Sequence, residues 1–241
     1  MTSPSVRLSR ARAVHDPFDY YHLDATFPPD RAERLRQTFP DTGFTKVSSA
    51  DPHKTYTMWA RVLHPASPPA DGGARPDDDL PAPWRAFLAE VTGADYRARL
   101  AELTGIDLAS CPVEVNLWRY PHDCWLDPHV DKESKLVTHV FYFNRPWPAQ
   151  WGGNLLVLGS GSADDVVHRV APADNTSVVL VRSEKSWHAV EKADPRNPGA
   201  ARLSAQVIFH RPAEPESTEP ESTEREFRAA EPAMAARPDR Y

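Results

Sequence analysis

The middle of the chain reads RYPHDCWLDPHVDKESKLVTHVFYFNRPWPAQWGGNLLVL (residues 119–158), and in it short runs of β-branched and aromatic residues alternate with turn residues. Such runs are typical of β-strands, and similar runs continue along the chain without helical patterns between them. The predicted strands are residues 113–120, 135–144, 154–159, 165–172, 176–182, 186–191 and 202–210, with two more at 44–49 and 56–63. Many short strands at this spacing predict a mainly β fold of the sandwich or barrel kind.

Two stretches with helical periodicity lie upstream of most of these strands. Residues 28–39 form a short amphipathic run after two prolines, and residues 83–105 keep apolar side chains at helical spacing until Gly105. Both patterns predict helices that support the β core. Between them, residues 64–83 are rich in Pro, Asp and Gly, which predicts a long surface loop, either a lid over a site or a simple insertion.

The C-terminal end differs from the rest in composition. Residues 212–241 are rich in Pro and Glu and contain a tandem EPEST repeat. So little apolar content does not offset the entropy lost on ordering, so we expect a disordered tail. The remainder, residues 1–211, is expected to form a single domain, with supporting helices within about 28–105 and a β core at about 112–211.

Length, charge and cysteine content exclude several classes of protein. The chain has 241 residues, a formal net charge of -6 and two cysteines. Phosphate contacts need clustered Lys and Arg, which are lacking, so we expect no nucleic-acid partner. Two cysteines cannot form a disulfide framework, and no apolar run is long enough for a membrane span or a secretory leader. These observations predict a cytoplasmic protein without a membrane partner; they say nothing of its oligomeric state.

A His-x-Asp triplet occurs twice, at His129–Asp131 and at His22–Asp24. On a strand, residues two apart point to the same side, so either triplet could contribute two ligands to a metal. A non-heme Fe(II) site needs a second imidazole. For the later triplet the candidate is His188, which opens a predicted strand and can return beside it.

Three other histidines compete for the role of second imidazole. His139 and His168 fall inside predicted strands, where a histidine with satisfied hydrogen bonds is the simpler interpretation, and His210 is expected to begin the polar tail. Arg202 supports the choice of His188 as the second imidazole. Arg202 and Ser204 share one face of the last predicted strand, which follows His188. A guanidinium and a hydroxyl directed into a β core are costly unless an anion meets them there.

Taken in order, these motifs resemble the Fe(II)/2-oxoglutarate-dependent oxygenases, and within them the prolyl-4-hydroxylase-like branch. In that branch an Arg-Tyr strand leads to Pro-His-x-Asp, then to a Tyr-x-Asn turn, a Trp, a Gly-Gly-x-Leu strand, a His and finally Arg-x-Ser. The matching residues are Arg119, Tyr120, Pro128, His129, Asp131, Tyr142, Asn144, Trp147, Gly152, Gly153, Leu155, His188, Arg202 and Ser204.

The resemblance implies a double-stranded β-helix, the cupin-like jelly roll. It implies that His129, Asp131 and His188 bind Fe(II), and that Arg202, helped by Ser204, binds the distal carboxylate of 2-oxoglutarate. O₂ is the other cosubstrate, and ascorbate is a candidate reductant.

At Leu126 the sequence departs from the prolyl-hydroxylase pattern, which often has a Tyr that contacts the cosubstrate there. Tyr120, Thr138 or Tyr142 are the candidates to replace it. The halogenating members of the superfamily carry Gly or Ala at the position of Asp131, so the carboxylate implies a hydroxylase. The chain also resembles small bacterial oxygenases that hydroxylate or chlorinate free amino acids.

The substrate is predicted from one strand. Glu114, Asn116 and Trp118 alternate along it with Tyr120 and are candidates to line a pocket for a small amino acid; alternatively, the aromatic residues are ordinary core and Glu114 faces solvent. We therefore expect hydroxylation of a C–H bond in a free amino acid or amino-acid-derived small molecule, with release of succinate and CO₂. A peptidyl, prolyl-type hydroxylase is the alternative, and a non-enzymatic jelly-roll binding module is the third hypothesis.

Overall fold

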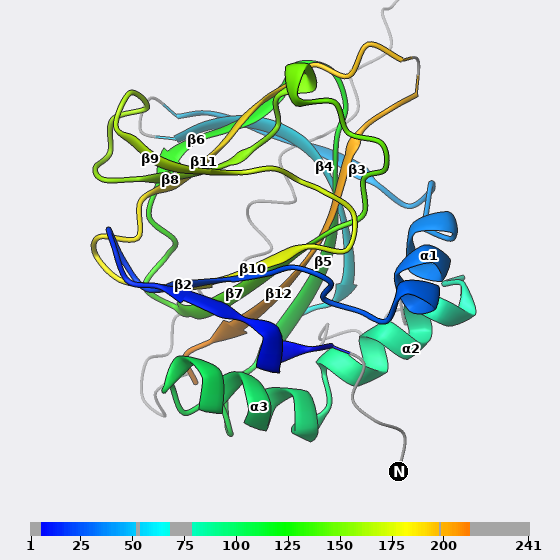
Figure 1. Ribbon diagram of the computed structural model, residues 1–241, viewed down its shortest axis with the longest axis vertical. Helices are drawn as coiled ribbons and strands as arrows, with labels where there is room; N and C mark the ends of the chain where they lie inside the picture. Colours follow the sequence, from blue (N-terminus) through cyan, green and yellow to red (C-terminus); the bar gives the residue numbers. More distant parts are fainter. Residues whose placement is uncertain (1–5, 52–53, 68–78, 198, 213–241) are drawn as a thin grey trace, which may run out of the picture.

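The computed structural model describes residues 6–51, 54–67, 79–197 and 199–212 (Figure 1). The strands are β1 (Arg12–Val14), β2 (Tyr20–Leu23), β3 (Thr45–Asp51), β4 (Lys54–His64), β5 (Val113–Tyr120), β6 (Cys124–His129), β7 (Lys135–Tyr142), β8 (Leu155–Leu158), β9 (Val166–Val170), β10 (Ser177–Val181), β11 (His188–Ala193) and β12 (Arg202–His210). The helices are α1 (Pro29–Gln37), α2 (Ala82–Val91) and α3 (Ala94–Thr104), with short 3-10 turns at Leu8–Arg10 and Ala149–Trp151.

The strands form one curled antiparallel sheet whose two halves lie opposite each other, as Figure 1 shows. Its order is β1-β2-β10-β7-β12-β5-β4-β6-β11-β8-β9, and β3 pairs with β4 at the side. β4 pairs with both β5 and β6 and so connects the two halves. This is the predicted jelly roll, and the mainly β class with supporting helices is confirmed.

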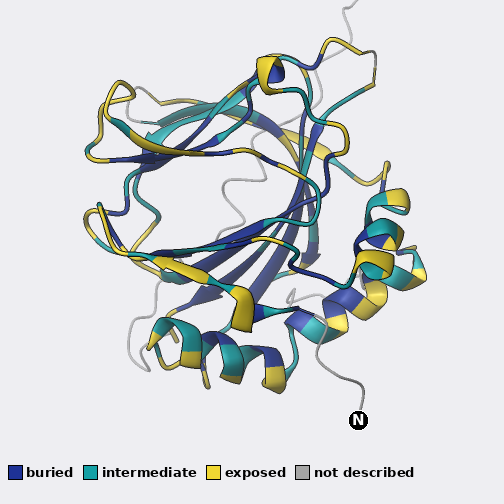
Figure 2. Cartoon of the chain, viewed as in Figure 1, coloured by how far each residue is buried: buried dark blue, intermediate teal, exposed yellow. Residues whose placement is uncertain are grey.

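Strict alternation along the central strands separates the core from the cavity. On β5, Val113, Val115 and Leu117 are buried in the core cluster that includes the helices, whereas the residues between them line the cavity. β12 and β7 follow the same rule, because they pair with β5 and with each other in one register. The sheet thus has one apolar face for packing and one face free to carry polar groups, and Figure 2 shows its strands as the most buried part of the molecule.

The three helices cover the outer face of the β10-β7-β12-β5 half. The largest of their apolar side chains, Trp84, Phe87 and Tyr96, are fully buried in the core cluster that includes the sheet. Each large aromatic side chain removed from water contributes about 2–3 kcal/mol, so this layer stabilises the wall on which the site is built. α3 ends at Gly105, whose φ of 72° is left-handed, which is the helix stop that the sequence predicts.

Several expectations need correction or fall outside the described residues. β1, β2 and β6 were not predicted, and β6 carries Asp127 and Pro128, which are residues unfavourable for a strand by pattern alone. His210 does not begin the tail: it is the last residue of β12 and is buried. The predicted disordered tail, except for Pro212, and most of the predicted long loop lie outside the described residues.

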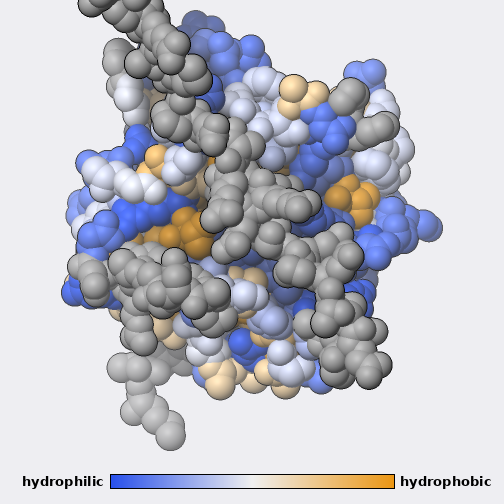
Figure 3. All heavy atoms as spheres, turned by 180° about the vertical axis from the view of Figure 1, so that it is seen from behind, coloured by the Kyte–Doolittle hydropathy of each residue, from blue (hydrophilic) through white to orange (hydrophobic). Residues whose placement is uncertain are grey.

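No helix among the described residues is both long and apolar enough to cross a membrane. The described surface is mostly hydrophilic on the face that Figure 3 shows. Among the large apolar side chains of the described residues, Trp59 and Val167 are the exposed ones.

Candidate metal centre and active site

Two strands place the two candidate imidazoles opposite each other. β6 and β11 are antiparallel and pair His129 directly with His188, and the centroids of the two rings lie 4.3 Å apart. Asp131 follows two residues after His129, and its Oδ1 lies 3.9 Å from Nε2 of that histidine. One ligand atom from each of the three side chains lies within 4.8 Å of the others, and all three side chains are buried. The arrangement can hold a metal ion.

Backbone carbonyls orient both imidazoles through Nδ1, so that Nε2 of each ring is free. Nδ1 of His129 donates to the carbonyl of Asp127 at 2.9 Å, and Nδ1 of His188 donates to the carbonyl of Ser186 at 2.8 Å. Because a carbonyl only accepts, each ring carries its proton on Nδ1 and presents an unprotonated Nε2. Hydrogen bonds of this type orient metal-binding histidines and set their tautomer.

Asp131 is held on both oxygens. Nζ of Lys135 lies 3.0 Å from Oδ1, and the hydroxyl of Thr138 donates to Oδ2 at 3.1 Å. Burial opposes ionisation of this carboxyl, but the Lys135 ammonium outweighs it, and the pKa of Asp131 lies well below its usual range. The carboxylate is therefore charged at neutral pH and its orientation is set before any metal binds.

Burial acts on the imidazoles in the opposite sense. It lowers the pKa of His129 well below the usual value, with further lowering from the neighbouring His188. It also lowers the pKa of His188, although the charge of Asp131 works against this. Both imidazoles are therefore neutral at pH 7, which is the form that binds a metal.

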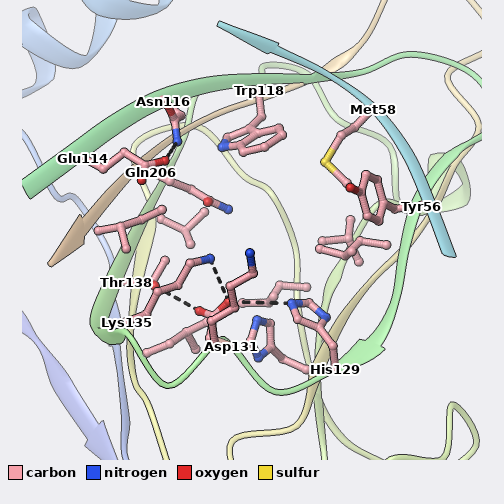
Figure 4. A pocket seen from close by; sticks show the side chains of 18 of the residues that line it. Tyr56, Met58, Glu114, Asn116, Trp118, His129, Asp131, Lys135, Thr138 and Gln206 are labelled. Carbon is pink, nitrogen blue, oxygen red and sulfur yellow. Dashed lines mark hydrogen bonds and ion pairs between the residues drawn. The ribbon is translucent and has the colours of Figure 1, made fainter. Parts of the chain in front are cut away.

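All three side chains line a cavity inside the jelly roll, and Figure 4 shows two of them, His129 and Asp131. Glu114, Asn116, Trp118 and Tyr120 line it from β5, as the alternation predicts. From β12 the cavity is lined by Arg202, Gln206, Ile208 and His210, and from β7 by Lys135, Thr138 and Val140. Glu114 is 6% exposed, so the expectation that it faces the cavity holds and the solvent-facing alternative is wrong.

Arg202 is a buried cation between two tyrosine rings. Its guanidinium carbon lies 4.9 Å from the ring centroid of Tyr120 and 5.1 Å from that of Tyr142, and the side chain is 2% exposed. Nε donates to the carbonyl of Gly153 at 2.7 Å, and Nη1 donates to the hydroxyl of Ser204 at 3.3 Å. No carboxylate of the described residues forms an ion pair with it, so N–H donors remain for an anion in the cavity.

Ser204 and Tyr142 stand behind Arg202 and do not themselves line the cavity. The buried hydroxyl of Tyr142 has no hydrogen-bond partner within the described part of the chain. Tyr120 differs, because its hydroxyl donates to the sulfur of Met58 at 3.2 Å. Burial raises the pKa of both tyrosines, so both hydroxyls stay protonated.

Two further cavity residues come from outside the predicted core. Tyr56 and Met58, on β4, line the cavity beside Leu126, the position at which the prolyl-hydroxylase pattern has a Tyr. Their alternation on a predicted strand was a signal, but nothing in the sequence indicated which face of β4 meets the cavity. Lys135, Gln206 and His210 were likewise missed as cavity residues. Two of them had a signal in the sequence: Gln206 lies in phase with Arg202 on its strand, and Lys135 lies four residues after Asp131.

The remaining histidines have structural surroundings. His139 is fully buried and bridges the hydroxyls of Tyr96 and Ser177, at 2.8 and 2.9 Å. His168 contacts the hydroxyl of Tyr20 at 2.6 Å. His22 lies on β2, with its Nδ1 3.9 Å from a carboxylate oxygen of the largely exposed Asp24. Among the described residues, His129, Asp131 and His188 are the one group of three His, Cys, Asp or Glu side chains close enough together to hold a metal ion.

Fold and site together define a class: a jelly-roll protein with two histidines and one carboxylate converging in its cavity, the ligand set of non-heme Fe(II) oxygenases. Comparison with known families agrees, because residues 115–210 match the model of the 2OG-Fe(II) oxygenase superfamily. The matched residues make up less than half of the chain. Together with the His129, Asp131 and His188 triad, the match indicates a 2-oxoglutarate-dependent dioxygenase with Fe(II), 2-oxoglutarate and O₂ as cofactors.

Solved structures with the same fold include prolyl hydroxylases. A Pseudomonas putida prolyl-4-hydroxylase is 20% identical, with a TM-score of 0.57 over 80% of this chain and 92% of that one. A Trichoplax adhaerens prolyl hydroxylase, in complex with a fragment of hypoxia inducible factor, is 13% identical, with a TM-score of 0.56 over 79% and 83%. A Burkholderia pseudomallei 2OG-Fe(II) oxygenase family protein is 16% identical, with a TM-score of 0.56 over 79% and 84%. At these identities the likeness concerns the fold, and no curated protein matches the sequence.

The residues present fit these cofactors. Three neutral or anionic ligands with fixed orientation suit a divalent iron ion. A buried guanidinium that lines the cavity and has no acidic partner among the described residues suits a carboxylate of 2-oxoglutarate.

Proposed function

We propose that His129, Asp131 and His188 bind Fe(II), and that Arg202 binds the distal carboxylate of 2-oxoglutarate with help from Ser204. The observation that carries this proposal is the placement of a buried, preoriented ligand triad and a buried cation on the walls of one cavity. Burying a guanidinium without an anion raises the free energy of the folded state, because the charge loses its hydration. A carboxylate bound beside Arg202 would offset that desolvation cost.

The other predicted cosubstrate residues take different roles in this proposal. Tyr120 and Tyr142 act through Arg202, because their rings pack against its guanidinium and fix its plane. Thr138 acts on Asp131, whose second oxygen it holds.

The bound iron, with 2-oxoglutarate and O₂, supplies the oxidising chemistry, and the cosubstrate leaves as succinate and CO₂. The protein contributes ligand geometry, a fixed cosubstrate and a cavity inside the jelly roll. With Asp131 present as a third protein ligand, we propose hydroxylation of a C–H bond as the outcome.

We further propose that the substrate is a free amino acid or a small molecule derived from one. Supporting this, Glu114, Asn116 and Trp118 line the cavity of the ligand triad, and Oδ1 of Asn116 and Nε1 of Trp118 are buried without partners in the described part of the structure. Buried polar atoms of this kind favour a polar ligand. We also propose that residues 1–211 form one cytoplasmic oxygenase domain.

Peptidyl hydroxylation is the second candidate. The observation in its favour is that two of the similar structures are prolyl hydroxylases, one of them in complex with a protein fragment. A protein substrate requires access for a polypeptide, whereas a free amino acid requires only the enclosed cavity.

An anaerobic titration of the apoprotein with Fe(II) and 2-oxoglutarate tests the proposal. We expect the visible charge-transfer band of the chelate, and a shift of that band when one pool of amino acids is added. His129→Ala should lose the band, and Asp24→Ala, in the other triplet, should keep it. A band that ignores every amino acid pool would favour the peptidyl alternative, and failure of the band to form would refute the metal and cosubstrate assignments.

A further inference from the structure

One end of the cavity wall formed by β5 and β12 carries polar groups that neither the metal nor 2-oxoglutarate uses. Arg202 pairs with Tyr120, and Glu114 lies six residues further along β5, about 20 Å along a strand. Across the sheet, Glu114 pairs with Ile208, which pairs with Thr138 of the metal centre, a separation of about 10 Å. The side chain of Glu114 is therefore available to a third molecule.

The hydrogen bonds of Glu114 fix the orientation of its neighbours. Nε2 of His210 lies 3.0 Å from Oε2, and the amide nitrogen of Asn116 donates to Oε1. Burial opposes ionisation of Glu114, but these hydrogen bonds outweigh it and lower its pKa. Because a carboxylate only accepts, Asn116 must turn its nitrogen toward it. Its Oδ1 is left buried and without a partner among the described residues.

This wall therefore offers a negative charge and a free acceptor side by side. Two of the roughly four acceptor positions of the carboxylate are used, so it can accept further hydrogen bonds. A second carboxylate placed here would be repelled by Glu114, whereas an ammonium group would satisfy both acceptors. The amide of Gln206, which pairs with Asn116 on β12, lies beside them and also lines the cavity.

We propose that Glu114 and Asn116 bind the cationic amino group of the substrate, with His210 as the positioning residue that holds Glu114. This inference rests on the proposed oxygenase function and narrows its substrate to compounds with a protonated primary amine. Ile208, whose side chain lines the cavity between Glu114 and Thr138, gives the space between the amino group and the metal an apolar floor. That floor suits a short aliphatic segment, which supplies the C–H bond.

Calorimetric titration of the anaerobic Fe(II)–2-oxoglutarate form of the full chain tests this. The probes are 1-aminopentane, pentanoate and N-acetyl-lysinamide. We expect 1-aminopentane to bind tighter than pentanoate by about tenfold or more, the fold-change equivalent to ~1.4 kcal/mol. Glu114→Gln keeps the shape but removes the charge, and it should abolish most of that preference while the chelate band remains. Glu102→Gln, an exposed carboxylate on α3, is the matched control.

The two proposals fail separately. Pentanoate binding as tightly as 1-aminopentane, no binding of 1-aminopentane, or unchanged amine affinity in Glu114→Gln would each overturn the amino-group site even if the chelate band forms. Loss of the band with amine selectivity intact would instead refute the oxygenase assignment. If Glu114→Gln does not fold, the preference of the wild type for 1-aminopentane over pentanoate is the test of the amino-group site. Tighter binding of N-acetyl-lysinamide than of 1-aminopentane would identify a lysyl side chain as the source of the amine.

Discussion

Replacing Arg202 by Met should separate cosubstrate binding from folding. Nε and one N–H of Nη1 are engaged by Gly153 and Ser204, which leaves part of the guanidinium fork for a carboxylate. Two charge-assisted hydrogen bonds contribute about 3 kcal/mol or more together. The dissociation constant of 2-oxoglutarate should therefore rise about a hundredfold or more.

Arg202→Met should change the free energy of unfolding of the apoprotein much less than it changes the free energy of 2-oxoglutarate binding. The substitution leaves the carbonyl of Gly153 without its donor, at a cost of about 1–3 kcal/mol, but it also removes a buried cation that has no acidic partner among the described residues. At a 2-oxoglutarate concentration of 100 times the wild-type constant, the ligand should stabilise the wild type by about 2.7 kcal/mol. The same concentration should stabilise Arg202→Met by about 0.4 kcal/mol.

Urea unfolding of the anaerobic Fe(II) forms, with and without 2-oxoglutarate, measures both quantities. Arg119→Met is the matched control, because Arg119 is on the outer face of β5, where it donates to the carbonyl of Asp41 and lies over the ring of Phe44. Equal stabilisation of wild type and Arg202→Met by 2-oxoglutarate would show that Arg202 does not bind the cosubstrate. A loss of the same size in Arg119→Met would point to a nonspecific effect.

Three other predictions concern the metal, pH and the backbone. His188→Ala should abolish Fe(II) binding in equilibrium dialysis, because two ligands remain; retention of one iron per chain would contradict the triad. Burial lowers the pKa of His139 to about 3. Below about pH 6.5 this histidine is therefore protonated in the unfolded chain but stays neutral in the native state. The free energy of unfolding should consequently fall by about 2 kcal/mol between pH 7 and 5 because of this residue. His139→Gln should flatten that slope in urea titrations, and an unchanged slope would assign it to other groups. Gly152→Ala should lower the free energy of unfolding by more than Gly199→Ala, because both have left-handed φ but, of the two, Gly152 is the one at which a Cβ would clash with a carbonyl oxygen, that of Lys192; equal losses in thermal melts would rule out this clash.

The sequence alone determined the site where its geometry is local. His129 and Asp131 are two apart, and Glu114, Asn116, Trp118 and Tyr120 alternate on one strand, so a period of two places each set on one side. The turn residues between short apolar runs likewise determined most strands of the jelly roll. His188 and Arg202 were candidates from strand position and side-chain chemistry, and the resemblance to known oxygenases implied their roles as metal ligand and as anchor of the 2-oxoglutarate carboxylate.

Only the tertiary structure decided what meets across the cavity. The pairing of β6 with β11 places His188 opposite His129. β6 itself could not be predicted, because its extended conformation depends on pairing with neighbouring strands rather than on the propensities of its residues. The contact of His210 with Glu114 joins residues 96 apart in sequence, and β4 delivers Tyr56 and Met58 from outside the predicted core. Such contacts depend on sheet register over long separations, which local periodicity does not encode.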